Sequence, residues 1–540
     1  SGVENVMNSH GGEVVARFLA EQRVPHLFTL CGGHIAPILV AAKTAGIRVV
    51  DMRHEVNAVF AADATARLTG RPGVAVVTAG PGVTNTVTAL QNAALAQSPV
   101  VLLGGAAPTV LKGRGALQDI DQTTLLRPVV KQAFRVKRNC DLVTVLAAAF
   151  ETAGGGVPGP VFVECPIDLL YPEAMVRDWY GSQKKPPQTR SLRERLLQAY
   201  LRRHVDRMFA CSFETMEAAP WTPLDFAADP AVVAQAAEFL GQSRRPLAVI
   251  GGQALLRPER AAELARALDR MGVPLYLTGM ARGLMGGRHP LVMRHQRRKA
   301  LQEADTVLIA GMPCDFRLDY GRAISRQATL IGVNRSRRDL KLNRAPQLAA
   351  AADPGGFLTA LAEAGPFPET EWSSWRETLQ AREAERDAAI HRQAAEAVNG
   401  INPLRFLTAL EDFLDERALL VTDGGDFVAT AAYTLRPRGP LSWLDPGVFG
   451  TLGVGAGFAA GAKLCRPGAE VWLIYGDGAA GYSLAEFDTL VRHRLPVIAV
   501  VGNDAGWAQI ARDQVRYLED DVATGLAPTA YEKVAEGLGA

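Results

Sequence analysis

Two apolar runs decide the fold: VWLIYGDG at residues 471–478 and PVIAVVGN at residues 496–503. Each run predicts a buried strand, and the segment between them predicts a helix opened by a capping box at residues 483–486. Because a strand–helix–strand crossover makes its two strands parallel, Asp477 and Asn503 should leave the sheet at the same edge. Two hard oxygen ligands beside glycines predict a Mg²⁺ site that holds a diphosphate.

A second pattern lies near the N-terminus, where RHE at residues 53–55 follows an apolar strand and opens a helix of small residues. A strand at 74–78 and the turn AGPG at 79–82 come next. A glutamate at a helix start has a structural explanation, since the helix dipole favours a carboxylate there. Glu55 also stands at a strand exit, where ligands bind in parallel α/β folds, and this favours a functional role.

Length and composition set the class of protein. The 540 residues exceed what one core holds and predict about three domains, while 52 glycines and 48% hydrophobic residues fit a globular α/β protein. We expect doubly wound parallel sheets, with domains at residues 1–180, 230–395 and 396–540 and a linker at 181–229. A net charge of +2 gives no reason to expect a nucleic-acid partner.

The six cysteines show no CxxC and no metal-ligand spacing, so we expect small buried thiols of a reducing compartment rather than disulfides. The sequence contains no run of 18 apolar residues, so it predicts no membrane span. The linker nevertheless predicts an amphipathic helix near residues 191–209, with leucines at helical spacing and arginines beside them. This helix either docks on the protein's own domains or lies on a membrane surface.

Taken in this order, the two main patterns resemble the pyrimidine and diphosphate motifs of thiamine diphosphate (ThDP) enzymes, in the group of acetolactate synthases and 2-hydroxyacyl-CoA lyases. The resemblance extends over essentially the whole chain and implies ThDP and Mg²⁺ as cofactors. It implies that Glu55 contacts N1′ of the aminopyrimidine. It also implies that Asp477, Asn503 and the backbone carbonyl of Ala505 bind the metal.

The same resemblance assigns further residues to the site. Leu452 would support the two rings of the cofactor, the Gly33 amide could stabilise an oxyanion, and Gln118 would reach the site of a facing subunit. His34 would either relay a proton or be a packed residue. The remaining implied cofactor contacts are Gly425, Asp426, Phe427, Gly453, Gly476, Gly478 and Ala479.

The chain departs from the family pattern at three places. Gly502 stands where members have the first of two asparagines, and Asp426 and Phe427 stand where many have glutamine and histidine. Members also continue beyond the point at which this sequence ends, at Ala540, with a final strand and helix. We therefore expect the diphosphate domain to be incomplete at its C-terminal end.

Other segments indicate a branch of the group. DPGVFGT at residues 445–451 and GYS at 481–483 resemble the lyases rather than the synthases. A basic run (Arg294, Arg297, Arg298 and Lys299) suits the phosphates of CoA or ADP, and FAD less well, although a solvated face explains it equally.

The reaction implied is cleavage of a 2-hydroxyacyl-CoA, in lipid metabolism, to formyl-CoA and an aldehyde one carbon shorter. The alternatives are an acetolactate-type carboligase acting on 2-keto acids, or a silent scaffold with this fold. The resemblance further implies a homodimer or homotetramer associated with the endoplasmic reticulum membrane, with a cytoplasmic location as the alternative.

Overall fold

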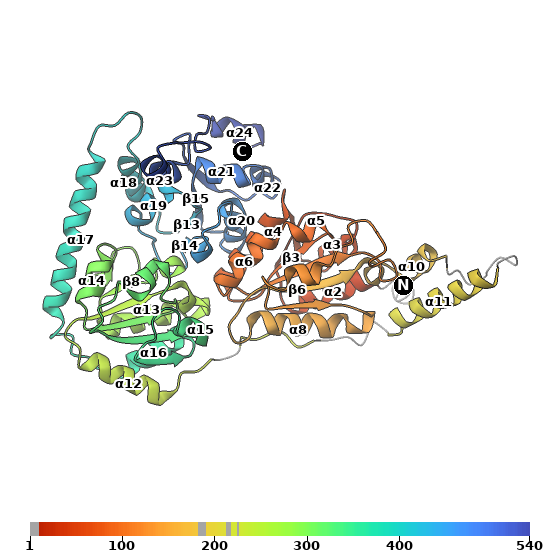
Figure 1. Ribbon diagram of the computed structural model, residues 1–540, viewed down its shortest axis with the longest axis horizontal. Coiled ribbons are helices and arrows are strands. Elements are labelled where there is room, and N and C mark those ends of the chain that lie inside the picture. The colour runs from red at the N-terminus through yellow and green to blue at the C-terminus, as the bar shows by residue number, and fades with distance from the viewer. Residues whose placement is uncertain (1–9, 182–190, 212–217, 224–225) are drawn as a thin grey trace. The chain divides into compact units, whose positions relative to one another are not determined.

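The structure is a computed structural model that describes residues 10–181, 191–211, 218–223 and 226–540. The chain divides into two compact units, one of Ser1–Ala66 with Arg71–Pro223 and one of Arg67–Gly70 with Leu224–Ala540. The described residues form three sheets, one in the first unit and two in the second, and all paired strands in them are parallel (Figure 1). This confirms the predicted α/β fold class.

The sheet of the first unit has the order β2-β1-β3-β4-β6-β5. Every residue of β3, β4 and β6 is buried, because helices cover both faces of a parallel sheet and its strands become continuous apolar runs. The strands are β1 (His26–Thr29), β2 (Arg48–Asp51), β3 (Gly73–Val77), β4 (Val100–Ala106), β5 (Gln132–Arg135) and β6 (Val161–Pro166).

Helices α2 (Gly11–Glu21), α3 (Ala36–Thr44) and α8 (Leu142–Gly154) pack a common core against one face of this sheet. Helix α4 (Glu55–Thr69) approaches β3 so closely that a Cβ on Gly73 would lie 1.9 Å from the carbonyl oxygen of Ala62. The other helices of the unit are α5 (Pro81–Thr84), α6 (Val87–Leu95), α7 (Gln122–Leu126), α9 (Ile167–Leu170), α10 (Glu173–Trp179) and α11 (Leu192–Met208).

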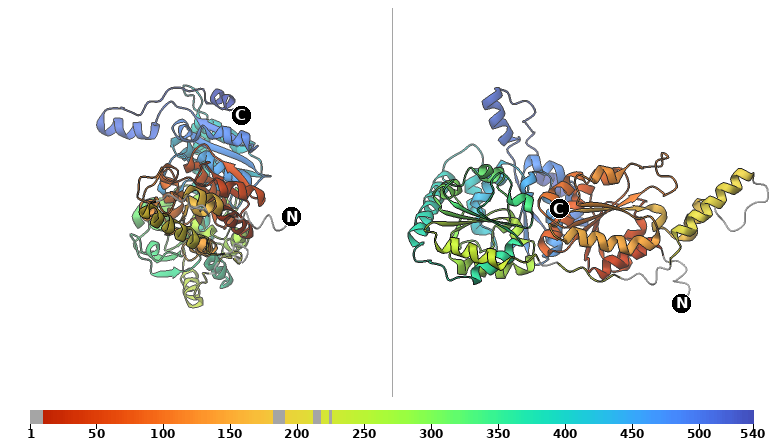
Figure 2. Two further views of the ribbon diagram at one scale, coloured as in Figure 1. Left: turned by 90° about the vertical axis from the view of Figure 1, so that its right-hand side faces the viewer. Right: turned by 60° about the horizontal axis from the view of Figure 1, so that its bottom comes forward.

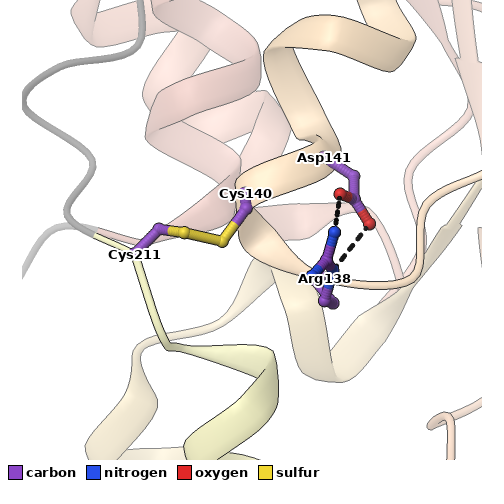
Figure 3. Close-up of a disulfide and its surroundings, with 4 residues drawn as sticks. All are labelled: Arg138, Cys140, Asp141 and Cys211. Carbon is purple, nitrogen blue, oxygen red and sulfur yellow. Dashed lines mark hydrogen bonds and ion pairs between the residues drawn. A yellow bond between two sulfur atoms is a disulfide. The ribbon is translucent and has the colours of Figure 1, made fainter.

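A disulfide joins Cys140, in the short helix η1 (Asn139–Asp141), to Cys211, just beyond α11; their Cα atoms are 5.5 Å apart (Figure 3). The expectation that all six cysteines are thiols is therefore wrong for this pair. The two residues are 71 positions apart, so only the tertiary fold brings them together and no local spacing signals the bond. Val205 and Met208 of α11 are buried, which places the C-terminal half of the predicted linker helix on its own domain.

The first sheet of the second unit has the order β12-β11-β10-β7-β8-β9. Helices α14 and α17 contribute to the core on one face, and Trp375 of α17 donates its indole N–H to the carbonyl of Pro246 (3.0 Å). The strands are β7 (Pro246–Ile250), β8 (Leu275–Leu277), β9 (Val292–Met293), β10 (Thr306–Ala310), β11 (Thr329–Asn334) and β12 (Leu348–Ala351). The helices are α12 (Pro230–Gly241), α13 (Ala261–Met271), α14 (Arg297–Glu303), α15 (Arg337–Leu340), α16 (Pro354–Glu363) and α17 (Ser373–Ala394).

The other sheet of the second unit has the order β14-β13-β15-β16. Its strands are β13 (Ala418–Thr422), β14 (Trp443–Leu444), β15 (Glu470–Gly476) and β16 (Ile498–Gly502). Its helices are α18 (Pro403–Phe413), α19 (Asp426–Thr434), α20 (Gly455–Cys465), α21 (Asp477–Ser483), α22 (Glu486–Arg492), α23 (Ala508–Leu518) and α24 (Tyr531–Gly537).

The capping box predicted at residues 483–486 is wrong. Ser483 is the last residue of α21, its buried hydroxyl has no hydrogen-bond partner among the described residues, and α22 starts at Glu486 without a side-chain cap. Glu486 is instead buried and accepts a hydrogen bond from the hydroxyl of Thr489 (2.6 Å). Within the described ranges, no helix combines the length and the apolar character needed to cross a bilayer.

The effect of the Cys140–Cys211 disulfide on stability can be measured directly. Replacing Cys211 by serine should lower the free energy of unfolding by roughly 2–4 kcal/mol, because the bond closes a long loop and restricts the unfolded chain. Urea unfolding of Cys211→Ser and of the matched control Cys31→Ser, an exposed cysteine outside the disulfide, measures this difference. Equal stability of the two variants under oxidising conditions, or failure of peptide mapping to find the 140–211 link, would contradict the assignment.

Candidate active site

The parallel register of β15 and β16 creates the edge of the site. Gly476 pairs with Gly502 across the two strands, so the residues that follow, Asp477 and Asn503, leave the sheet at the same edge, as the sequence predicted. Asp477 is only 2% exposed, and its two carboxylate oxygens accept hydrogen bonds from the amides of Gly478 (2.8 Å) and Gly506 (3.2 Å). These amides fix the direction of the carboxylate.

The other two predicted metal ligands are partly engaged within the protein. Asn503 donates its side-chain amide to the carbonyl of Thr529 (2.9 Å), and its amide oxygen lies 3.4 Å from the N–H of Ala505. The backbone carbonyl of Ala505 accepts a hydrogen bond from the amide of Leu526 (2.7 Å). Because a carbonyl oxygen has two lone pairs, one remains to bind a metal.

The chemistry of this donor set fits a hard divalent cation. Carboxylate, amide and carbonyl oxygens are the ligands that Mg²⁺ takes. In the described ranges, no group of three or more His, Cys, Asp or Glu side chains could hold a metal ion. Burial and the neighbouring charge of Asp477 raise the pKa of Asp504, and a cation at this edge would relieve that repulsion.

A cavity of about 240 Å³ opens at this edge. It is lined by the predicted residues Gly425, Asp426, Phe427, Leu452, Gly476, Asp477, Gly478 and Ala479. The predicted residues Asn503 and Gly453 lie beside it rather than in its lining. The lining also includes Trp507, Gln509 and Ile510, which the sequence analysis did not predict. For Trp507, its position four residues after Asn503 was the available sequence signal.

Two positions of this cavity must be glycine, because large side chains occupy the space that a Cβ atom would need. A Cβ on Gly478 would lie 2.5 Å from the indole of Trp507, and a Cβ on Gly424 would lie 2.1 Å from Cδ2 of Leu452. Leu452 therefore rests directly on the backbone at Gly424. This position is compatible with its predicted role under the cofactor rings, which stays a prediction.

The residues that depart from the family pattern compensate for one another. The ring of Phe427 occupies the space above Gly502, where a Cβ would lie 2.3 Å from the ring, so the glycine makes room for the phenylalanine. Asp426 forms an ion pair with Arg512 of α23. An aspartate beside a bound diphosphate would be repulsive, and this arginine offsets its charge.

Asp423 is a site-supporting residue that the sequence did not single out. Its carboxylate accepts hydrogen bonds from the amides of Gly424 (2.7 Å), Gly453 (3.0 Å) and Gly455 (2.8 Å), and thereby holds the segment that carries Leu452. Burial raises its pKa to about 6, against the lowering effect of these three amides. Only its position at a strand end before two glycines could have signalled this role.

In the first unit, Glu55 is the first residue of α4 and is 6% exposed. The side-chain amide of Asn85 donates to its Oε2 (3.0 Å). A Cβ at Gly82 would stand 3.5 Å from Oε1, so the glycine leaves the approach to that oxygen open. One carboxylate oxygen is thus oriented by the protein, while the space beside the other is kept clear.

Three other predicted residues of the first unit have distinct surroundings. His34 is 9% exposed, its Nδ1 lies 3.2 Å from the hydroxyl of Thr78, and burial lowers its pKa, so the ring is neutral near pH 7. The backbone carbonyl of Gly33 accepts a hydrogen bond from the Tyr171 hydroxyl (3.0 Å). Gln118 has a positive φ of 62° and lies against Gly80, which has no room for a Cβ.

A second cavity of the second unit, of about 280 Å³, is lined by arginines. Arg282, Arg294, Arg297 and Arg436 surround it, together with Gly286 and Gly287. Two members of the predicted basic run therefore line a cavity, whereas Arg298 is exposed and pairs with Asp319 (3.3 Å), and Lys299 is exposed.

Three half-buried arginines of this cavity donate to backbone carbonyls. Arg282 donates to Ala432 (2.7 Å), Arg294 to Tyr433 (2.7 Å) and Leu435 (2.9 Å), and Arg297 to Arg317 (2.8 Å). Burial and the nearby Arg436 lower the pKa of Arg294 to about 10. Carbonyl oxygens satisfy these N–H groups without neutralising the charge, while Asp387, outside the lining, pairs with Arg436 (2.7 Å). With four arginines and, among the described residues, no acidic side chain in its lining, the cavity keeps an excess of positive charge.

Asp423 predicts a pH dependence of stability. Because its folded pKa is raised from 3.8 to about 6, its contribution to stability is fully present below the unfolded pKa and is lost as the pH rises through the folded pKa. Relative to Asp423→Asn, which does not ionise, the wild-type protein should lose about 2 kcal/mol of unfolding free energy between pH 4 and 7. Urea unfolding of both cofactor-free proteins measures the difference; a difference independent of pH would contradict the raised pKa.

Comparison with known proteins identifies the family of the chain. Three thiamine pyrophosphate enzyme families match the chain: the N-terminal TPP binding domain at residues 9–125, the central domain at 233–361 and the C-terminal TPP binding domain at 423–540.

Among curated proteins, the chain is 52% identical to "2-hydroxyacyl-CoA lyase 2" of Bos taurus over all of this chain and 85% of that protein. It is 53% identical to the Mus musculus protein of the same name, again over all of this chain and 85% of the relative. It is 34% identical to a "Probable acetolactate synthase" of Mycobacterium bovis, over 98% of this chain and 90% of that protein. The chain therefore belongs to the thiamine pyrophosphate-dependent enzyme family, within the group that contains the 2-hydroxyacyl-CoA lyases and the acetolactate synthases.

Proposed function

We propose that this enzyme uses ThDP and Mg²⁺ to cleave a 2-hydroxyacyl-CoA into formyl-CoA and an aldehyde one carbon shorter. The C1–C2 bond breaks, the hydroxyl-bearing carbon becomes the aldehyde carbon, and the proton released from the hydroxyl is balanced by one added to the formyl carbon. The observation that carries the proposal is the likeness, at about half of all positions and over the whole chain, to proteins named 2-hydroxyacyl-CoA lyase 2. Bound ThDP would supply the nucleophilic carbon and the electron sink.

The protein's own contribution begins at Glu55. Asn85 holds one oxygen of its carboxyl group and Gly82 keeps the space beside the other open, so the group can share a proton with the aminopyrimidine. In the second unit, Asp477, Asn503 and the Ala505 carbonyl would hold Mg²⁺ against the diphosphate of a bound cofactor.

The arginine-lined cavity is the proposed docking site for the phosphates of CoA. Three half-buried guanidinium groups there carry charge that backbone carbonyls do not neutralise, and phosphates would supply negative charge. The two glycines in its wall allow a ligand to approach the backbone closely. ADP carries the same groups and is the alternative occupant, and FAD is less favoured.

We also propose a homo-oligomer, a homodimer or homotetramer. Gln118 is expected to serve the site of a facing subunit, and its neighbour Leu117 is 80% exposed, an apolar side chain that such a subunit would cover.

For location we propose the endoplasmic reticulum, in association with its membrane. The Cys140–Cys211 disulfide supports an oxidising compartment and disfavours the cytoplasmic alternative.

The Mg²⁺ assignment is tested by thermal unfolding with ThDP and Mg²⁺. At about 100 times the dissociation constant, the ligands should stabilise the wild-type protein by about 2.7 kcal/mol, because they bind only the folded state. Asp477→Asn should lose this stabilisation, whereas Asp412→Asn, an exposed aspartate on α18, should keep it. An unchanged shift in Asp477→Asn would remove Asp477 from the metal site.

The reaction is tested with a 2-hydroxyacyl-CoA, ThDP and Mg²⁺, with mass spectrometry of the products. We expect formyl-CoA and the shortened aldehyde, and we expect Glu55→Gln to lower turnover by roughly 10²–10⁴-fold, since the amide keeps the shape but cannot share the proton.

Pyruvate should give little acetolactate in the same assay. Acetolactate without any aldehyde from a hydroxyacyl-CoA would replace the lyase by the carboligase. Absence of both products, with ThDP bound, would favour a silent scaffold.

A further inference from the structure

Helix α11 has an outer half that the proposed reaction does not use. From Ser191 to Tyr200 nine of the ten residues are exposed, and Figure 2 shows this helix, in yellow, extending away from the sheet of its own unit. Its exposed apolar side chains are large: Leu192 is 72% exposed, Leu196 64% and Tyr200 62%. Side chains of this kind are costly to leave in water together.

The other half of the helix is firmly attached. Val205 and Met208 are buried, and the His204 ring lies 2.7 Å from the hydroxyl of Thr109. The Cys140–Cys211 disulfide fastens the chain just beyond the last turn. The C-terminal half of α11 is therefore anchored to its own domain, and the outer half extends from this anchored part.

The order of residues along one face of the helix is specific. Leu192, Leu196 and Tyr200 recur every four residues, and Arg203 and Arg207 continue the same line within about 80° around the axis. This face is apolar at its outer end and cationic nearer the base. Over the whole helix five arginines against two acidic residues leave a charge of +3.

The neighbouring helix α10 adds apolar surface. Met175 and Trp179 are each 44% exposed, and α10 contacts α11. Tryptophan and tyrosine are the residues that favour the boundary between lipid and water, since each has an apolar ring and a polar group.

We propose that the outer half of α11 binds the surface of an anionic lipid bilayer. Leu192, Leu196 and Tyr200 enter the boundary between headgroups and acyl chains, while Arg203 and Arg207 contact the lipid phosphates. The positive charge selects an anionic bilayer over a neutral one and over a second copy of the same basic helix. The proposal extends the proposed membrane association by naming the surface that makes the contact.

The test is flotation of the full chain with vesicles of phosphatidylcholine and phosphatidylserine, and with vesicles of phosphatidylcholine alone. We expect binding to the first only, weakened by salt. Leu192→Ser/Leu196→Ser should abolish flotation, and Arg203→Glu/Arg207→Glu should lower the bound fraction more than about tenfold. The matched controls are Ile401→Ser, 81% exposed, and Arg326→Glu/Arg405→Glu, both exposed arginines; they should float like the wild type.

Light scattering of the same variants shows whether a second copy of the chain, rather than a bilayer, covers this face of α11. A smaller oligomer for Leu192→Ser/Leu196→Ser, without flotation of the wild type, would overturn the proposal in favour of a contact between copies. No flotation and no change of oligomer would overturn it as well. Lyase activity on a short, soluble hydroxyacyl-CoA, measured without vesicles, tests the reaction separately, because none of these residues belongs to the active site.

Discussion

The register between β15 and β16 is the constraint on which the diphosphate half of the site depends. Because Gly476 pairs with Gly502, the carboxylate of Asp477 and the amide of Asn503 start from the same edge of one sheet. A shift of one residue would send one ligand to the opposite face. The strand register sets the position of Asp477, and the amides of Gly478 and Gly506 then fix the direction of its carboxylate.

Departures from the family pattern at this edge are best understood in pairs. Phe427 needs the space that Gly502 leaves, and Asp426 needs the charge of Arg512. Phe427 opposite a residue with a Cβ at position 502 would clash, and Asp426 without Arg512 would leave an unbalanced negative charge at the cavity. The pairs keep the shape and charge of the cavity while the side chains differ.

The sequence predicted the fold class, the parallel strands and about half of the residues that line the cavity at this sheet edge, because those follow from local runs and glycine-rich turns. It could not predict the Cys140–Cys211 bond or the hydrogen bonds from the amides of Gly453 and Gly455 to Asp423, since these depend on segments far apart in the chain. The capping box failed for a related reason. Local spacing fitted Ser483 and Glu486, but in the structure Glu486 is buried and its carboxylate accepts a hydrogen bond from Thr489.

The two cavities of the second unit carry opposite charges, and this difference separates two ways of binding phosphate. The cavity at the sheet edge contains Asp477 and Asp504, so a diphosphate can bind there only together with a cation that outweighs both carboxylates. The described lining of the other cavity contains Arg282, Arg294, Arg297 and Arg436 and no acidic side chain, so phosphates would need no metal to bind there. On the function proposed above, a metal-bound diphosphate and the phosphates of a CoA thioester would be directed to different cavities by charge.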